Sequence, residues 1–173
     1  EIRNNAFATL DPLLSVTKGL TLGQISELTG LSGATIQNWI KRGWVTATVD
    51  KKYTERQIVR ILLINILRDV MKLEDIAALM SYINGKVDDL SDDILHDKEL
   101  YNLLCKLICH LEREKIYNPT QVAKEIDKNL GGNYKDKERE ILNRVLLIMV
   151  LGYRSSNLMA TIKTEFKTIQ GGK

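Results

Sequence analysis

The sequence predicts an all-α protein with one small β element, and three observations lead to this class. Apolar residues make up 44% and charged residues 27% of the 173 residues, as in ordinary globular proteins. The chain holds only two prolines, and its leucines and isoleucines recur at helical spacing over most of its length. Side chains that favour strands are concentrated in residues 44–53.

Composition also indicates where the protein works. No uncharged apolar run reaches the ~18 residues that a membrane span needs, and the longest, Val145–Leu151, is far shorter. The sequence does not open with the basic and apolar regions of a signal peptide. Cys105 and Cys109 are the only cysteines, too few for a disulfide scaffold. We therefore expect a soluble cytoplasmic protein that has no membrane partner.

The first predicted elements are short helices. Apolar residues within 1–20 favour one helix that packs on the body of the protein. The signals are sharper from Thr21, which is a suitable N-cap for a helix over residues 22–29. Gly30 suits the C-terminal end of that helix because glycine adopts the left-handed conformation at low cost.

A second helix is expected immediately after this glycine. Ser32 is its predicted N-cap, residues 33–42 form its body, and the next glycine ends it. Two helices joined by about three residues around a glycine form a helix-turn-helix motif. We expect Ile25 and Ile36 to meet between the two helices, with Trp39 packed beneath the second one.

The other side of the second helix carries polar residues suited to reading DNA. An amide side chain can form two hydrogen bonds with adenine in the major groove, and a lysine can reach a phosphate or a guanine. The free N–H groups at the start of a helix also favour phosphate oxygens. The residues expected on this exposed face are Gly33, Ala34, Gln37, Asn38 and Lys41.

A small β-hairpin, or wing, is expected next. Residues 44–49 favour a strand, residues 50–52 favour a turn, and Tyr53 begins a return strand. The stretch 32–60 carries six basic and two acidic residues, although the whole chain carries only +3, and a local basic patch attracts phosphates; the alternative is an ordinary solvated surface. Its basic residues are Lys41, Arg42, Lys51, Lys52, Arg56 and Arg60.

Two further helices and an acidic stretch follow the wing. Thr54 and Gln57 predict a capping box for a helix that runs to about Met71. Apolar spacing predicts another helix over residues 73–83. Residues 84–97 are polar and acidic, and we interpret them as a flexible linker; the alternatives are mimicry of DNA and binding of a basic partner.

The C-terminal half is predicted to be a helical bundle. Leucines and isoleucines between 100 and 111 follow helical spacing, and Asn118 with Pro119 begins the next helix. A long helix from about Lys135 is expected at the centre of this half. The later apolar residues either extend that helix or form a last one. The predicted domains are therefore residues 1–83, the linker 84–97 and residues 98–173.

Five short motifs occur in a fixed order between Thr21 and Met80. They are TLGQI opening the first helix, TGLS at the turn, an aromatic residue followed four positions later by glycine, a tyrosine and an acidic residue opening the third helix, and LEDI opening the fourth. In order and spacing this stretch resembles the MerR-type winged helix-turn-helix domain. The whole chain also resembles a bacterial family of unknown function that joins such a domain to a helical C-terminal half.

The resemblance implies contacts with duplex DNA, because in MerR-type proteins the second helix enters the major groove and the wing touches the flanking backbone. Two features depart from the family pattern: Ala34 and Gln37 stand where arginines are frequent, and residues 46–48 replace an arginine-rich start of the wing. The positions carried over are Ala34, Thr35, Gln37, Asn38 and Lys41 in the groove, with Lys51, Lys52 and Tyr53 on the wing.

Dimerisation is expected to come from the C-terminal half. The long helix through which MerR-type proteins pair is interrupted here by the linker 84–97. A lone copy would contact a single half-site through few phosphates. We therefore expect a homodimer through the C-terminal helices, and these helices either serve only for pairing or also sense an unidentified effector.

The sequence supports no enzyme, cofactor or metal site. It has two histidines and no nucleophile motif beside either of them. Cys105 and Cys109 supply at most two ligands from one helix, whereas a tetrahedral metal site needs four. We interpret both cysteines as small buried apolar residues, and metal or redox sensing is the alternative.

The predicted function is sequence-specific regulation of transcription. Gln37 and Asn38 are expected to read bases. The residues expected to position the backbone are Lys41, Arg42, Lys51 and Lys52. The alternative is a protein–protein interaction adaptor that keeps the fold without reading DNA, which Ala34 and Gln37 favour because they replace basic residues.

Overall fold

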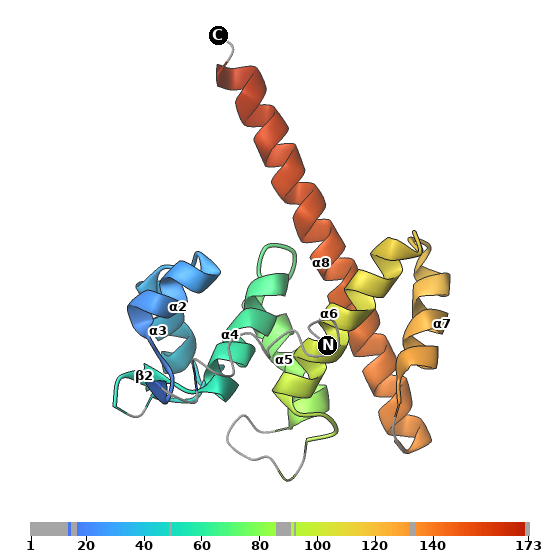
Figure 1. Ribbon diagram of the computed structural model, residues 1–173, viewed down its shortest axis with the longest axis horizontal. Helices are drawn as coiled ribbons and strands as arrows, with labels where there is room; N and C mark the ends of the chain where they lie inside the picture. Colours follow the sequence, from blue (N-terminus) through green and yellow to red (C-terminus); the bar gives the residue numbers. More distant parts are fainter. Residues whose placement is uncertain are drawn as a thin grey trace.

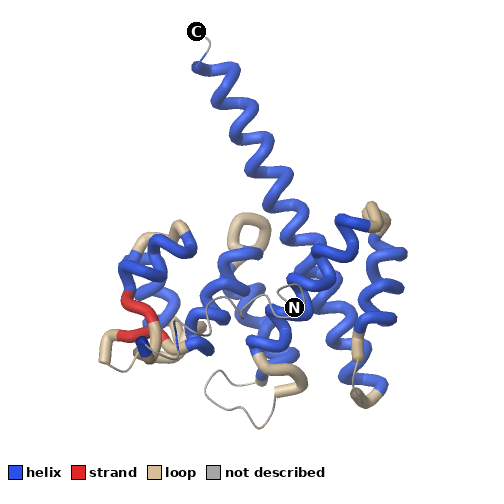
Figure 2. Tube along the Cα trace, viewed as in Figure 1, coloured by secondary structure: helices blue, strands red, loops and turns tan. Residues whose placement is uncertain are grey.

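The computed structural model describes residues 14, 17–48, 50–85, 91, 93–131 and 134–171. The described part is mostly helical, with one two-stranded antiparallel sheet (Figures 1 and 2). In chain order the elements are β1 (Leu20–Thr21), α2 (Leu22–Thr29), α3 (Gly33–Lys41), β2 (Lys52–Tyr53), α4 (Glu55–Leu67), α5 (Leu73–Asn84), α6 (Asp97–Arg113), α7 (Pro119–Asn129) and α8 (Asp136–Gly171). The helix expected within residues 1–20 lies mainly outside the described residues.

Helix α4 occupies the middle of the molecule (Figure 1). It is apolar on nearly every side, which is typical of a helix buried all round, and it packs against α2, α5, α6 and α8. Gln57 supports the predicted start of α4, because its Oε1 accepts a hydrogen bond of 2.8 Å from the backbone N–H of Thr54. The helix ends at Leu67, four residues before the predicted Met71.

The two helices predicted over 22–29 and 33–42 are confirmed within one residue at their ends. Thr21 caps α2 with a capping box, since its Oγ1 accepts from the backbone N–H of Gln24 at 3.4 Å, and the Gln24 side chain accepts from Thr21 N–H at 2.9 Å. Gly30 ends α2 in the left-handed conformation, with φ of 69°. Leu28 of this helix has an exposed side chain.

The predicted hairpin is wrong in its pairing. Strand β2 pairs with β1, in a register that places Leu20 opposite Tyr53, and residues 44–48 form no strand. The reason lies in α4: the Gln57 amide donates to the carbonyl oxygens of Thr46 and Ala47, at 2.8 and 2.9 Å. These backbone groups are therefore bonded to a side chain rather than to a second strand. Val49 lies outside the described residues.

The C-terminal half contains the expected helices. Asn118 caps α7 by accepting hydrogen bonds from the backbone N–H groups of Thr120 and Gln121. Of the two alternatives for the last apolar residues, extension of the long helix is confirmed, because α8 is continuous from Asp136 to Gly171. Its C-terminal part projects beyond the other helices (Figure 1).

Both predicted domains contribute to one core. The buried cluster runs from Ile25 and Trp39 near the N-terminus to Leu146 and Met149 on α8. Helices α4 and α8 approach so closely that a Cβ added to Gly152 would lie 2.5 Å from Cδ2 of Leu67. The ends of the predicted linker are also buried, at Asn84 and Asp97, while residues 86–90 and 92 lie outside the described part.

Candidate nucleic-acid interface

The candidate interface is built on the pairing of α2 with α3. Ile25 and Ile36 are both fully buried, as expected for the two side chains that join these helices. A Cβ added to Gly33 would lie 3.1 Å from Cδ2 of Leu22, so the start of α3 packs closely against α2. Gly33 was expected on the exposed face, but this packing makes it half-buried.

The turn between α2 and α3 is held in place by hydrogen bonds, one of which comes from α4. The backbone N–H of Gly30 donates to the carbonyl oxygen of Ser26 at 2.9 Å. Asn65 of α4 donates its amide N–H to the carbonyl oxygen of Thr29 at 3.2 Å. These bonds satisfy carbonyl groups that the end of a helix leaves free, and they therefore hold α3 in a defined orientation on the body.

Most residues of α3 that are predicted to contact DNA lie on one accessible face. Trp39 is buried, as expected, which turns the opposite side of α3 toward solvent. The exposed members of the predicted set are Ala34, Gln37, Asn38, Lys41, Arg42 and Lys51, whereas Thr35 and Lys52 are half-buried. Thr35 is held at the start of α3, because its hydroxyl lies 2.8 Å from that of Ser32.

Tyr53 is a correction to the predicted set. Its side chain is only 1% exposed, so it packs in the core and cannot lie along a DNA backbone. Burial raises the pKa of its hydroxyl above the ordinary value. That hydroxyl accepts a hydrogen bond of 3.1 Å from Nε2 of Gln37. Tyr53 therefore orients the Gln37 amide, which keeps its second N–H and its carbonyl oxygen for other partners.

Two of the predicted cations have partners inside the chain. Arg42 Nη1 lies 3.0 Å from Oε1 of Glu74, and the guanidinium lies over the ring of Trp44. Lys52 Nζ donates to the carbonyl oxygen of Thr17 at 2.6 Å. The Arg42–Glu74 pair is exposed, and exposed pairs are weak enough for the arginine to exchange its partner for a phosphate.

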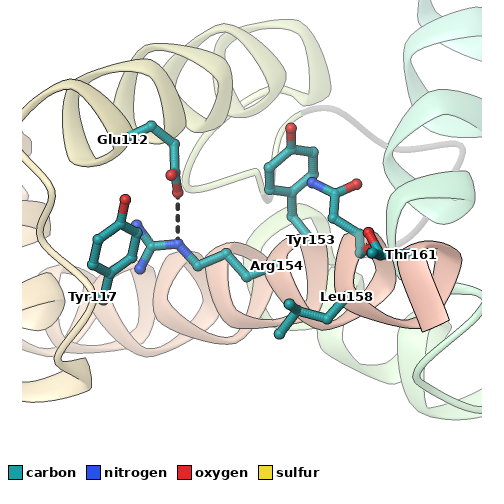
Figure 3. Close-up of a pocket in the computed structure, with 7 residues that line it drawn as sticks. Glu112, Tyr117, Tyr153, Arg154, Leu158 and Thr161 are labelled. Carbon is teal, nitrogen blue, oxygen red and sulfur yellow. Dashed lines mark hydrogen bonds and ion pairs between the residues drawn. The ribbon is translucent and has the colours of Figure 1, made fainter. Parts of the chain in front are cut away.

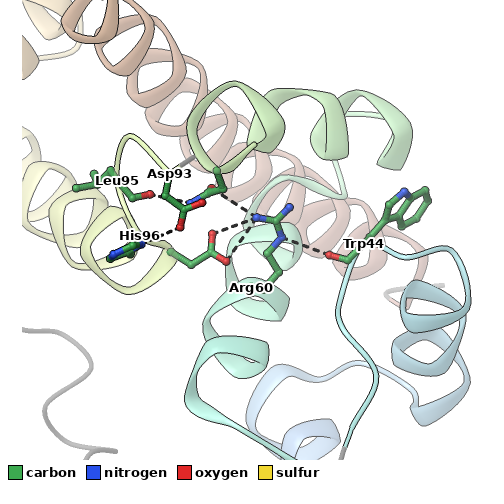
Figure 4. A network of polar contacts seen from close by, with 7 residues as sticks. Trp44, Arg60, Asp93, Leu95 and His96 are labelled. Carbon is green, nitrogen blue, oxygen red and sulfur yellow. Dashed lines mark hydrogen bonds and ion pairs between the residues drawn. The ribbon is translucent and has the colours of Figure 1, made fainter. Parts of the chain in front are cut away.

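A buried polar network connects this region to the C-terminal half (Figure 4). Arg60 of α4 donates through Nε to the carbonyl oxygen of Trp44 at 3.3 Å, and its Nη1 lies 3.2 Å from Oδ1 of Asp97. Asn84 donates to the carbonyl oxygen of Leu95 at 2.7 Å. Burial raises the pKa of Asp97, and the charge of Arg60 opposes that rise.

This network was missed in the sequence, although one signal was present. Arg60 stands among apolar residues on the buried side of α4, and a buried arginine requires a counter-charge. The acidic stretch 84–97 supplies that charge through Asp97, which begins α6. The described ends of the predicted flexible linker are thus fixed, with Asp93 also bonded to Nδ1 of His96 at 2.8 Å.

The cysteines form no evident metal site. Cys109 is exposed and Cys105 is half-buried, so the expectation that both are buried is wrong for Cys109 and holds only in part for Cys105. Burial raises the pKa of the Cys105 thiol, which lowers its reactivity as a thiolate. Among the residues that the structure describes, no three His, Cys, Asp or Glu side chains gather as metal ligands would.

An open groove of about 360 Å³ lies between the end of α6 and α8 (Figure 3). Arg154 crosses it, with Nε 2.9 Å from Oε1 of Glu112 and the guanidinium over the ring of Tyr117. Nη2 of Arg154 also donates to the carbonyl oxygen of Ile116 at 2.8 Å. The charge of the arginine is thereby neutralised within the protein, and it fixes α8 against the end of α6.

One helix in the described part of the chain, α8, is long and apolar enough by length and composition to cross a membrane. Its most apolar window of 18 residues has a mean hydropathy of 1.5, and 28% of that window is buried within the protein. The buried share includes Val145, Leu146 and Met149, which pack in the core. Core helices of soluble proteins meet the same criterion, so this composition alone is weak evidence for a membrane span.

The chain belongs to the family described as Domain of unknown function (DUF1836), whose model matches residues 12–104. The match covers α2 to α5, the stretch 84–97 and the first part of α6. The chain is also similar to the uncharacterized protein YkrK of Bacillus subtilis (strain 168), with 24% identity over 160 residues that cover 86% of this chain and 69% of YkrK. No solved structure matches the chain.

Proposed function

We propose that this protein is a transcriptional regulator that binds specific sequences of double-stranded DNA as a homodimer. The observation that carries the proposal is the outer face of α3, where Ala34, Gln37, Asn38 and Lys41 lie together in solvent. An exposed helix that follows a glycine turn and packs on the body through a buried tryptophan fits the major groove. The motifs shared with MerR-type winged helix-turn-helix domains support the same function.

In this proposal Gln37 and Asn38 read base edges. The hydrogen bond to Tyr53 restricts the Gln37 side chain before DNA arrives, which lowers the entropy lost on binding. Bidentate pairing of an amide with adenine distinguishes that base from the other three. Each amide then contributes specificity at one base pair.

The surrounding cations position the DNA backbone. Lys41 and Lys51 are exposed, and Arg42 reaches a phosphate by leaving Glu74. Asp50 and Lys51 both have positive φ, near 55°, which forms a tight turn before β2. This turn, with Lys51 and Lys52, takes the role of the wing, even though its strand pairs with β1 rather than with a hairpin partner.

The proposal places the regulator in the cytoplasm and assigns it no reaction, cofactor or membrane. Pairing of two copies through the C-terminal helices would present two α3 helices to two half-sites. An effector that acts on these helices would then control the spacing of the half-site contacts.

A protein–protein adaptor is the second candidate function. The observation that favours it is the number of predicted DNA contacts already engaged within the chain, namely those of Gln37, Arg42 and Lys52. The exposed Leu28 on α2 also offers an apolar contact to a protein partner beside the α3 face. An adaptor would bind its partner with little dependence on salt or on duplex DNA.

The test begins by selecting binding sites from genomic DNA fragments with the purified protein. Affinity for the enriched site is then measured for the wild type and for Gln37→Ala and Asn38→Ala. Each substitution is expected to cost about 1–3 kcal/mol at one base pair and to relax specificity there. Lys51→Ala is expected to weaken binding to all sequences alike and to lower the slope of affinity against salt by about one unit.

Gln121→Ala is the matched control, because it removes an exposed amide from α7, away from α3. This variant should bind as the wild type does. Absence of any enriched site, or equal loss of affinity on all sequences for the amide and the lysine variants, would reject the assigned roles and favour the adaptor.

A further inference from the structure

The outer end of α8 carries five exposed large apolar side chains, those of Leu158, Met159, Ile162, Phe166 and Ile169. The last buried residue of this helix is Gly152, and every residue from 157 to 171 is exposed. Leu158, Ile162 and Ile169 are 65%, 60% and 71% exposed, respectively. Figure 1 shows this segment projecting away from the other helices.

The exposed apolar residues belong to a heptad pattern. From position 148 to 169, the residues on this face are separated alternately by three and by four positions, which is the spacing of the two core positions of a coiled coil. We call this face the outer seam. Its members are Ile148, Leu151, Ser155, Leu158, Ile162, Glu165 and Ile169.

The outer seam lies opposite the side of α8 that packs in the core. Leu142, Val145 and Met149 are buried against the other helices, and their positions fall about half a turn away from the seam. Ile148 is 38% exposed, so the seam is open along the base of the helix as well as beyond it. It spans about 33 Å at 1.5 Å per residue.

A single helix with this surface is not stable in water by itself. Between 155 and 171 the only charged residues are Lys163, Glu165 and Lys167, so few ion pairs at helical spacing support the segment. Isolated helices of this length are marginal even in favourable sequences, and most helical stability in proteins comes from packing of an apolar face. The seam therefore requires an apolar partner surface.

We propose that two copies of this chain pair through their outer seams in antiparallel orientation. In the register that centres the pair between Leu158 and Ile162, Leu158 of each copy lies opposite Ile162 of the other. Leu151 then lies opposite Ile169, and Ser155 lies opposite Glu165. Among the six seam members from Leu151 to Ile169, apolar positions meet apolar positions, and the two polar members meet each other.

This self-complementarity identifies a second copy as the occupant. In parallel pairing each seam residue faces its own equivalent, which would put Glu165 against Glu165 and leave two like charges in contact. In the antiparallel register the Ser155 hydroxyl donates to the Glu165 carboxylate, once at each end of the interface. Met159 and Phe166 lie beside the seam on the same side and widen the apolar contact.

The inference rests on the dimer in the proposed function, but its test uses no DNA. Sedimentation equilibrium is expected to give the wild type twice the chain mass of 19.7 kDa. Ile162→Asp should reduce the mass to 19.7 kDa without loss of helical content in the body, because Ile162 contacts none of the core. Thr164→Asp is the matched control, since it places the same charge on the opposite face of α8 and should remain a dimer.

The orientation is tested with two charges at one position. Ser155→Glu faces Glu165 only in the antiparallel register and should raise the dimer dissociation constant by about tenfold or more. Ser155→Lys should leave it unchanged or lower it, because the lysine would face a carboxylate. Combining Ser155→Glu with Glu165→Ser should restore the wild-type value.

Three results would overturn the inference. A measured mass of one chain for the wild type would show that no dimer forms. An equal rise of the dimer dissociation constant in Ser155→Glu and Ser155→Lys would indicate parallel pairing. If the wild type binds lipid vesicles as single chains, the outer seam contacts a membrane and not a second copy. If the wild type forms the dimer but binds no specific DNA sequence, the proposed function is rejected and the antiparallel interface is still supported.

Discussion

Arg60 and Asp97 form the most consequential pair of single residues in this protein. Both side chains are at least 94% buried, and the pair joins α4 to the first turn of α6. Arg60 also fixes the backbone at Trp44, directly after the helix that we propose to read DNA. This buried ion pair therefore contributes, together with Asn65 and the Gly30 turn, to the position of the candidate interface on the body.

Removal of one partner should destabilise the protein strongly. Asp97→Ala leaves the Arg60 charge buried without compensation, and we expect the free energy of unfolding to fall by about 3–5 kcal/mol. Urea denaturation near neutral pH measures the loss. Glu74→Ala is the control, because it breaks an exposed pair with Arg42 and should cost about 1 kcal/mol or less. Equal losses in the two variants would contradict the role given to the buried pair.

Tyr101 makes stability depend on alkaline pH. Burial, together with its contact to Cys105, raises the pKa of Tyr101 from 10.0 to about 12. Between these values the unfolded chain releases the proton that the folded chain still holds, so stability is complete below pH 10 and falls as pH rises toward about 12. Tyr101→Phe should flatten this fall, as measured by denaturation midpoints across the range. Tyr82→Phe, at an exposed site, should keep the wild-type slope, and identical slopes in all three proteins would contradict the prediction.

At the scale of the elements, the turn between α2 and α3 determines how the candidate reading helix stands on the body. Gly30 holds a φ of 69°, and nothing lies within 4 Å of the place where a Cβ would be. The requirement for glycine is therefore one of backbone conformation and not of space. A side chain at this position carries the cost of the left-handed conformation alone.

Two glycine substitutions separate these effects. Gly30→Ala should lower the free energy of unfolding by about 1–2 kcal/mol. Gly23→Ala is the matched control, because Gly23 lies within α2 with equally open space and no positive φ. It should raise stability by up to about 1 kcal/mol, the helix propensity that alanine gains over glycine. Thermal denaturation measures both changes in stability. If the two variants change the free energy of unfolding in the same direction, the explanation by backbone conformation is contradicted.

At the scale of the whole molecule, α4 unites the two halves of the chain. Its Leu67 is fully buried and lies against Gly152 of α8, while Asn65 of the same helix holds the turn of the candidate interface. The buried cluster is continuous from α2 to α8. We therefore expect the chain to unfold as one cooperative unit rather than as two domains.

Leu67→Ala tests this cooperativity. The cavity should lower the free energy of unfolding by about 2–5 kcal/mol. Tryptophan fluorescence reports on Trp39 and Trp44 in the N-terminal half, and circular dichroism reports on all helices together. The two midpoints should shift by the same amount in the variant. Two separate transitions would instead support independent units at residues 1–83 and 98–173.

The local elements follow from the order of residues along the chain. The helices over 22–29 and 33–41, the cap at Thr21 and the buried positions Ile25 and Trp39 all follow from neighbours within one or two turns. Caps and turn glycines act through hydrogen bonds and backbone angles of adjacent residues, so they can be predicted from the sequence. The exposed face of α3 could be predicted for the same reason.

The features that join distant residues depend on how the helices pack in three dimensions. Strand β2 pairs with β1, and Tyr53 is buried in the core. Arg60 forms an ion pair with Asp97, which lies 37 positions later in the sequence. Periodicity tells which residues share a face, but not which surface will cover that face. On α8, which is apolar on several sides, only the packing reveals that the body covers one face and leaves the outer seam to solvent.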